Sequence, residues 1–195
     1  MVPAAAAIPS LFIPKGHTLM LDGGHLRQGI ELRLGRGLIR VAITSTEPGV
    51  GATDPVTLGF LQSGDQLSLE LLRHARLHLE AFEPTSLLSS PCEPAEDAIG
   101  LCDWTAALLI IQHLGGSEQR LRALIQLLVA RLGSRCGGWY ELPLRLKHER
   151  LAEMVNHTRV TVSRHMARWR QAGLIEVGPA ATPCLRFAPA LIEGS

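Results

Sequence analysis

Four side chains near the C-terminal end of the chain have the types and spacing that could read the edges of DNA base pairs. Arg159, Val160, Ser163 and Arg164 fall on one face of a helix if their segment is helical. A guanidinium group can donate two hydrogen bonds to guanine O6 and N7, and an aliphatic group such as Val160 can pack on a thymine methyl group. We therefore expect this face to contact bases. The alternative is that the two arginines lie on an ordinary solvated helix face.

The neighbouring sequence predicts two short helices that would position this face. The first helix covers residues 147–155 and turns Leu151 and Val155 inward. Asn156 follows as a turn residue that tolerates a positive φ. Thr158 should then cap the second helix with its hydroxyl group. A helix, a tight turn and a second helix with exposed arginines is the geometry that places a helix end in the major groove.

The second helix and the segment after it complete this predicted module. Three of its side chains recur at helical spacing and should be buried: Val162, Met166 and Trp169. Trp169 is therefore expected in the core rather than stacked on a base, whereas Arg168 belongs to the exposed face. Residues 174–177 and 184–187 flank a turn-rich stretch, which predicts a two-stranded wing.

Two further helices are predicted upstream. Residues 103–114 are apolar on nearly all sides, so this helix needs cover from its own domain and from a second subunit. The next helix should begin with Ser117 as its N-cap and end at Gly133. It carries a single apolar stripe: Leu121, Leu124, Ile125, Leu128, Val129 and Leu132.

The first half of the chain has the pattern of an antiparallel β structure. Glycine or proline interrupts residues 18–88 every several positions, and short alternating segments lie between these breaks. The predicted fold class is α+β, with an N-terminal antiparallel β-roll, a connecting helix and a C-terminal winged helix-turn-helix. The predicted domains are residues 1–94, 95–116 and 117–195, with a short helix over residues 95–99.

Charge is distributed unevenly between the N-terminal and C-terminal halves of the chain. The whole chain has a formal net charge of +1. Residues before Gly115 include 7 basic and 12 acidic side chains, whereas the rest of the chain has 12 basic and 6 acidic ones. Such a balance is expected when only the second half meets phosphate groups.

Residues 158–164 have the sequence Thr-Arg-Val-Thr-Val-Ser-Arg and are followed by Gly173-Leu174-Ile175. This segment resembles the recognition helix of the Crp/Fnr superfamily of bacterial transcription regulators. It is most similar to the global nitrogen regulators, which carry Arg-Val where cyclic-AMP receptor proteins carry Arg-Glu. Ser63-Gly64-Asp65 and residues 81–88 resemble parts of the β-roll of this family. The resemblance implies a homodimer that binds an inverted repeat in double-stranded DNA and acts on RNA polymerase.

The resemblance also implies roles for individual residues. Base contacts would come from Arg159, Val160, Ser163 and Arg164, with Val160 tuning specificity. Phosphate contacts are expected from another set: His148, Thr158, Thr161 and Arg168. Because the family dimerises through the helix between its domains, the apolar residues Leu108, Ile111 and Leu114 are the expected dimer interface.

The effector of such a regulator is left open by the sequence. The glutamate and the arginine–hydroxyl pair that hold a cyclic nucleotide in this family are absent, so cyclic-nucleotide binding is not expected. Arg33, Arg36 and Arg40 could line a pocket for a carboxylate such as 2-oxoglutarate. A solvated strand edge explains the same arginines, and an effector-independent regulator is a further alternative.

Other functional classes find little support in the sequence. His74 and His78 are four residues apart but lack an evident third ligand, and the four cysteines show no paired ligand spacing, so we predict no metal site. A small metalloprotein or enzyme using the histidines remains a weaker alternative, because no nucleophile motif or phosphate-binding loop is present. No apolar run approaches the ~18 residues of a membrane span. We expect a cytoplasmic protein that is not an enzyme.

Overall fold

The computed structural model of the chain describes residues 10–22, 30–45, 54–69, 75–91, 100–178 and 184–194. The chain divides into two compact units, Met1–Thr105 and Ala106–Ser195. The division falls inside helix α1 (Leu101–Gln112). The short helix predicted over residues 95–99 lies outside the described residues, as do His74, Cys92 and the turn at residues 179–183.

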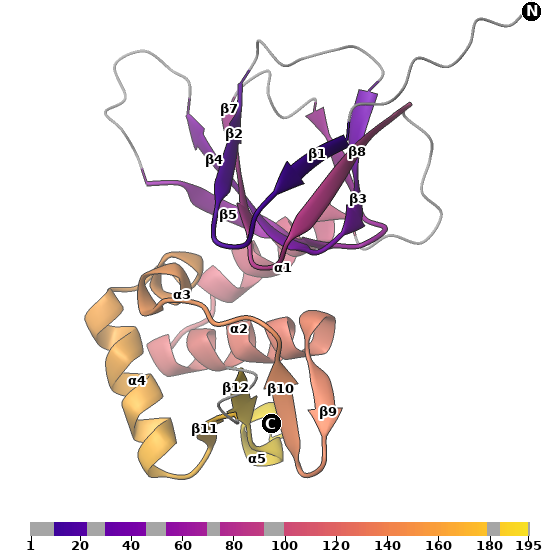
Figure 1. Cartoon of the computed structure of the whole chain (residues 1–195). Helices are drawn as coiled ribbons and strands as arrows, with labels where there is room; N and C mark the ends of the chain where they lie inside the picture. Colours follow the sequence, from indigo (N-terminus) through magenta and orange to yellow (C-terminus); the bar gives the residue numbers. More distant parts are fainter. Residues whose placement is uncertain are drawn as a thin grey trace, which may run out of the picture. The chain divides into compact units, whose positions relative to one another are not determined.

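The described part of the first unit contains two four-stranded antiparallel sheets, drawn in indigo to magenta in Figure 1. The strand orders are β1-β8-β3-β6 and β2-β7-β4-β5. The strands are β1 (Ser10–Ile13), β2 (Thr18–Leu21), β3 (Ile30–Arg36), β4 (Leu38–Ser45), β5 (Val56–Gln62), β6 (Gln66–Ser68), β7 (Ala75–Ala81) and β8 (Thr85–Pro91). The predicted β-roll is confirmed.

The inward side chains of the two sheets form one hydrophobic core. Leu32, Leu34 and Leu87 come from the first sheet, and Ile39 and Leu79 come from the second. Alternation along each strand places every second residue on this inner face. Burial of each such side chain stabilises the fold by about 1.5–3 kcal/mol, so the alternating pattern in the sequence fixes which face of each strand points inward.

The start of α1 covers part of the outer face of the second sheet. The ring of Trp104 lies 5.4 Å from that of Phe60 on β5, measured between centroids. The hydroxyl group of Thr105 donates a hydrogen bond of 3.1 Å to the carbonyl oxygen of Leu58. A Cβ atom at Gly59 would be 2.4 Å from the Cβ atom of Trp104, so this close approach requires glycine. Phe60 on this outer face is therefore buried beside the start of the helix.

The described part of the second unit combines the end of α1 and four further helices with a small antiparallel sheet in the order β11-β12-β10-β9 (Figure 1). Its elements after α1 are α2 (Ser117–Leu132), β9 (Ser134–Cys136), β10 (Trp139–Leu142), α3 (His148–Met154), α4 (Arg159–Gln171), β11 (Ile175–Val177), β12 (Leu185–Phe187) and α5 (Pro189–Ile192). The predicted helix-turn-helix with a strand pair after it is confirmed. Strand β9 was not predicted; it forms a hairpin with β10 across Gly137 and Gly138.

Helix α2 follows the sequence pattern along its length but not at its start. All six residues of the predicted stripe are buried, and Gly133 ends the helix as predicted. The prediction that Ser117 is the N-cap is wrong, because Gly116 occupies that position and no side chain caps the helix. Ser117 is the first helical residue, and its hydroxyl group hydrogen-bonds Nε2 of His165 on α4 at 2.9 Å.

Candidate nucleic-acid interface

The turn between α3 and α4 is built as the sequence predicts. Asn156 has a φ of 52°, the left-handed conformation that asparagine tolerates better than most residues. The hydroxyl oxygen of Thr158 accepts a hydrogen bond of 3.2 Å from the backbone N–H of Thr161. This cap satisfies a donor that the helix itself cannot. The position where α4 begins is therefore set by two local side chains.

The inner face of α4 is anchored in the core of the second unit. Val162, Met166 and Trp169 are buried, and they face a core that includes Leu151 and Val155 from the α3 segment. The indole N–H of Trp169 donates a hydrogen bond of 2.9 Å to the carboxylate of Glu118. Trp169 is thus a core residue, which confirms the interpretation made from its spacing.

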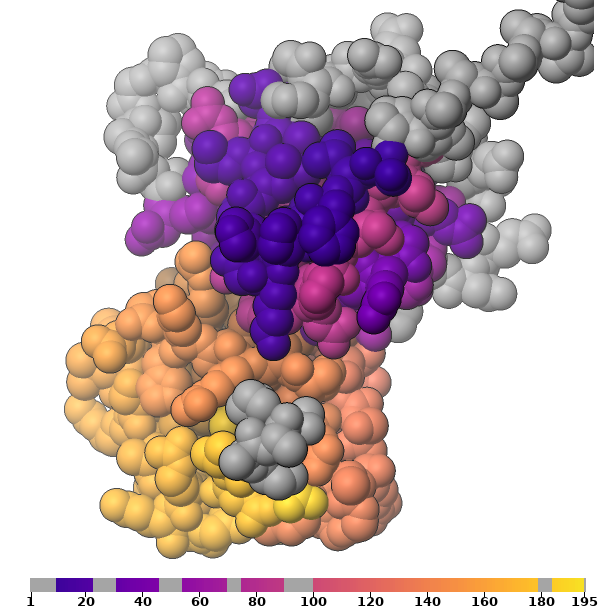
Figure 2. Space-filling view, viewed as in Figure 1, coloured from indigo at the N-terminus to yellow at the C-terminus, as the bar shows by residue number. Residues whose placement is uncertain are grey.

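The opposite face of α4 is open to solvent at its N-terminal end. Val160 is 66% exposed, a high value for an aliphatic side chain. The side chain of Arg159 is 69% exposed, and Arg164 is exposed as well. Helix α4 forms one edge of the second unit, at the left in Figures 1 and 2. The predicted base-contacting arginines therefore point away from the protein rather than into its core.

Two side-chain pairs link this open face of α4 to the first turn of α3. Nε of Arg159 lies 3.0 Å from a carboxylate oxygen of Glu149. Nδ1 of His148 lies 2.7 Å from the hydroxyl oxygen of Ser163. Ser163 is consequently only partly exposed, although it belongs to the predicted base-contacting set. Burial, followed by the positive charges of nearby arginines such as Arg170, lowers the pKa of His148 below its ordinary value.

The C-terminal half of α4 is tied to the start of α2. Arg168 forms an ion pair with Glu118, whose carboxylate also accepts the bond from Trp169. The hydrogen bond from Arg168 is the main reason why the pKa of Glu118 is lowered. Ser117 and His165 add the neighbouring contact between the same two helices. Arg168 was predicted to contact phosphate; it remains 57% exposed while it pairs with Glu118.

The predicted wing is present as an antiparallel pair of strands, β11 and β12, that extends through β12 to β10. Arg186 on β12 pairs with Glu176 at 2.6 Å and with Glu141 at 2.9 Å. Its guanidinium group also lies over the ring of Trp139, 5.8 Å from the centroid. Arg186 therefore joins three strands of this sheet.

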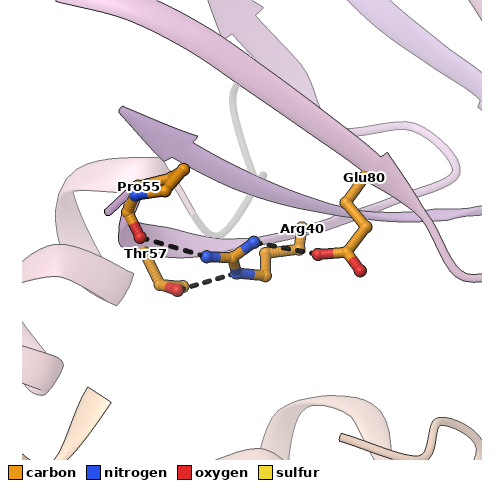
Figure 3. A network of polar contacts seen from close by, with 4 residues as sticks. All are labelled: Arg40, Pro55, Thr57 and Glu80. Atoms are coloured by element: carbon orange, nitrogen blue, oxygen red, sulfur yellow. Dashed lines mark hydrogen bonds and ion pairs between the residues drawn. The ribbon is translucent and has the colours of Figure 1, made fainter. Parts of the chain in front are cut away.

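In the first unit, the structure does not bring together the three arginines considered for an effector pocket. Arg40 is only 1% exposed and donates hydrogen bonds to Thr57 at 2.8 Å, Glu80 at 2.9 Å and the Pro55 carbonyl oxygen at 3.4 Å (Figure 3). Arg33 and Arg36 are exposed on β3, which belongs to the other sheet.

The two hypotheses for these arginines are corrected accordingly. Arg33 alternates with the inward residues of β3, and Arg40 alternates with those of β4, so the two side chains leave opposite faces of the roll. A pocket shared by all three arginines is therefore wrong. The solvated strand edge is wrong for Arg40, because that arginine is buried with a carboxylate partner.

Burial corrects two of the three residues expected at the dimer interface; the third, Leu114, is half-buried and lies just after the end of α1. Leu108 and Ile111 are buried within the chain, so they are not available to a second subunit. The apolar residues that α1 leaves open are Leu109 and Ile110, which are 57% and 66% exposed. Because the helix is apolar nearly all round, its sequence could not show which side is covered.

The remaining chemistry of the described residues is sparse. Within the described ranges, no three histidine, cysteine, aspartate or glutamate side chains gather as metal ligands would. Cys102 and Cys136 are exposed and Cys184 is buried, all as free thiols. No helix among the described residues is long and apolar enough to span a membrane.

Comparison with known proteins identifies relatives of both the site and the whole chain. Residues 119–182 match the family model of the Crp-like helix-turn-helix domain. The chain is 29% identical over 184 residues to the regulatory protein CysR of Synechococcus elongatus, covering 89% of this chain and 87% of that protein. It is 28% identical over 116 residues to the global nitrogen regulator of Nostoc sp., covering 51% of this chain and 52% of that protein.

A similar fold is found among solved structures. A transcriptional regulator of the CRP/FNR family from Thermus thermophilus superposes with a TM-score of 0.67 at 18% sequence identity. The match covers 95% of this chain and 99% of that one. The order of a β-roll followed by a helix-turn-helix is therefore shared over nearly the whole length of both chains.

Proposed function

From these likenesses we propose that the chain is a transcription regulator of the Crp/Fnr superfamily, which binds operator DNA as a homodimer through the N-terminal end of α4. Arg159 and Arg164 would contact base edges, and Val160 would pack against a thymine methyl group. His148, Thr158, Thr161 and Arg168 would lie near phosphate groups. The proposed operator is an inverted repeat whose half-sites are about one DNA turn, ~34 Å, apart.

One observation carries this proposal. The capped end of α4 exposes a valine and two arginines on one face, while the other face is fixed in the core. Val160 is 66% exposed, so burial in the core does not explain an aliphatic side chain at this position. Such a face matches the mixture of apolar and hydrogen-bonding groups that a major groove presents.

Homodimerisation is proposed through α1. Leu109 and Ile110 form an apolar strip with exposed Ala106, at spacings of three and four residues that keep one helix face. A second copy of α1 would cover this strip. A glutamate at Ile110 should give a monomer in sedimentation that retains its circular dichroism but loses most of its operator affinity. An I110E protein that stays dimeric would contradict this assignment.

An effector bound by the three roll arginines is no longer part of the proposal, because Arg40 is buried apart from the other two. Two alternatives remain: the regulator needs no small-molecule effector, or it binds an effector at another site. Titration calorimetry with 2-oxoglutarate and with cyclic AMP separates these cases, and the proposal expects no heat of binding from either compound at the roll. RNA polymerase is the proposed downstream partner, which transcription in vitro would test.

The function itself is tested by selecting bound sequences from a random DNA pool. The proposal expects enrichment of a two-fold symmetric sequence with two half-sites. Arg164→Ala should reduce operator affinity and relax selection at one base pair in each half-site, with a cost of about 1–3 kcal/mol. Recovery of no preferred sequence by the wild-type protein would contradict the proposed function.

A further inference from the structure

Glu149 stands out on the proposed DNA-binding face because it is an acid among basic side chains. It belongs to the first turn of α3, and its carboxylate oxygen lies 3.0 Å from Nε of Arg159. Both side chains are largely exposed, so the pair forms at the surface that would meet DNA. A carboxylate there opposes phosphate binding, and its presence needs a reason beyond simple charge attraction.

The geometry of the pair leaves the two terminal guanidinium nitrogens of Arg159 available. A guanidinium group has five N–H donors in a planar fork, and the contact with Glu149 engages Nε. The two terminal nitrogens can still donate a pair of hydrogen bonds to guanine O6 and N7. A carboxylate on Nε also restricts rotation of the guanidinium plane, so less conformational freedom is lost when the base is bound.

We propose that Glu149 is a specificity-determining positioning residue, which orients Arg159 for base recognition and weakens attraction to DNA of any other sequence. This inference rests on the proposed function. Glu149 would act through Arg159 rather than by touching DNA, so its two effects have opposite signs. Non-specific affinity is reduced by the negative charge, whereas operator affinity is maintained by the oriented arginine.

The surroundings of Glu149 hold the pair in place. The hydrogen bond from its own backbone N–H, followed by the positive charges of Arg159 and Lys147, lowers the pKa of the carboxyl group, which keeps it ionised near neutral pH. Next to it, the hydrogen bond of 2.7 Å between His148 and Ser163 joins the same two helices. Glu149 and Arg159 are thus fixed on two elements whose separation is set independently of the ion pair.

An ordinary surface ion pair would behave differently. Its removal would change stability slightly and would leave the ratio of operator to non-specific affinity unchanged, because exposed pairs contribute little. A purely repulsive carboxylate would weaken binding to all DNA equally, so its removal would also keep the ratio. If Glu149 positions Arg159, its removal should raise non-specific affinity and also lower the ratio of operator to non-specific affinity.

The test measures binding of the full chain to its selected operator and to a shuffled duplex of equal length, at one fixed salt concentration. Glu149→Ala should raise affinity for the shuffled duplex and lower the operator-to-shuffled ratio, each by about twofold to fivefold. Glu149→Gln should raise non-specific affinity equally, since it removes the same charge. Its ratio should fall less, because the amide oxygen can still accept the bond from Nε of Arg159.

Two controls make the outcome specific. Glu153→Ala removes an acidic side chain from the same helix one turn later and should leave the ratio unchanged. In an Arg159→Ala background, Glu149→Ala should still raise non-specific affinity but should no longer alter the ratio. An unchanged ratio in the Glu149→Ala protein, or an equal fall in the Arg159→Ala background, overturns the inference while the proposed function stands. A wild-type protein that prefers no sequence overturns both.

Discussion

The buried ion pair in the roll gives the sharpest stability prediction. The side chain of Arg40 is 2% exposed and that of Glu80 is 30% exposed, with 2.9 Å between Nη1 and the carboxylate oxygen. Glu80→Ala removes a negative partner of a guanidinium group that cannot lose its proton and is almost fully buried. Breaking a buried pair in this way costs about 3–5 kcal/mol. Because water reaches Glu80, we expect a value near the lower end, about 3 kcal/mol.

A second variant separates the cost of breaking the ion pair from the loss of other favourable contacts. Arg40→Met combined with Glu80→Gln removes both charges and keeps the apolar stem of residue 40. It should recover at least about 1.5 kcal/mol of the loss, since replacing both members of a buried pair is far less costly than removing one. Thr57 and the Pro55 carbonyl oxygen lose a donor in this variant, so full recovery is not expected.

The assay should report on the first unit by itself, because the chain has two compact units. Hydrogen exchange of the backbone amides in β4 and β7, followed by mass spectrometry, measures the opening free energy of these paired strands. Glu80→Ala should lower that free energy by about 3 kcal/mol and leave the amides of α2 unchanged. A loss below about 1 kcal/mol, or a double variant as unstable as the single one, would refute this reasoning.

Three further predictions concern the second unit. Thr158→Ala should destabilise it by about 1 kcal/mol, because the N–H of Thr161 loses its cap, and urea unfolding with a Thr158→Ser control measures this. The pKa of His148 in the folded chain lies below its ordinary value of 6.5, so between these two pKa values the unfolded chain binds more protons than the folded chain. The free energy of unfolding should therefore fall as the pH is lowered from above 6.5 to below the folded pKa. His148→Gln should reduce this pH dependence. Trp169→Phe should cost about 1–2 kcal/mol, since Glu118 loses a hydrogen bond in a partly buried site, and a Tm equal to that of wild type would contradict this.

The features of the site that could be predicted from sequence are those set by near neighbours. Asn156 adopts its positive φ and Thr158 caps α4 because each acts on backbone groups within a few residues. The burial of Val162 and Trp169 follows from the helical period alone. These local rules identify both helices and the turn, and therefore which face of α4 carries the arginines.

The features that were missed depend on residues distant in sequence. Arg40 looks like an outward strand residue, but its partners Thr57 and Glu80 lie on the neighbouring strands. Ser117 has the side chain of a good cap, yet its hydroxyl group hydrogen-bonds His165, far along the chain. For α1, an all-round apolar sequence predicts burial without indicating that Leu108 is covered and Leu109 is open. No sequence pattern indicated a role for Glu149, because its contact with Arg159 depends on how α3 and α4 cross.

If arginines at the exposed end of α4 contact bases, removing one of them must change which base pairs the protein prefers. Affinities of wild-type and Arg164→Ala proteins would be compared on the selected operator and on duplexes that carry each alternative base pair at every half-site position. We expect Arg164→Ala to lose about 1–3 kcal/mol of binding free energy on the operator and to accept all four base pairs nearly equally at one position, while preferences at the other positions persist. A variant that binds every duplex as the wild-type protein does would contradict the account.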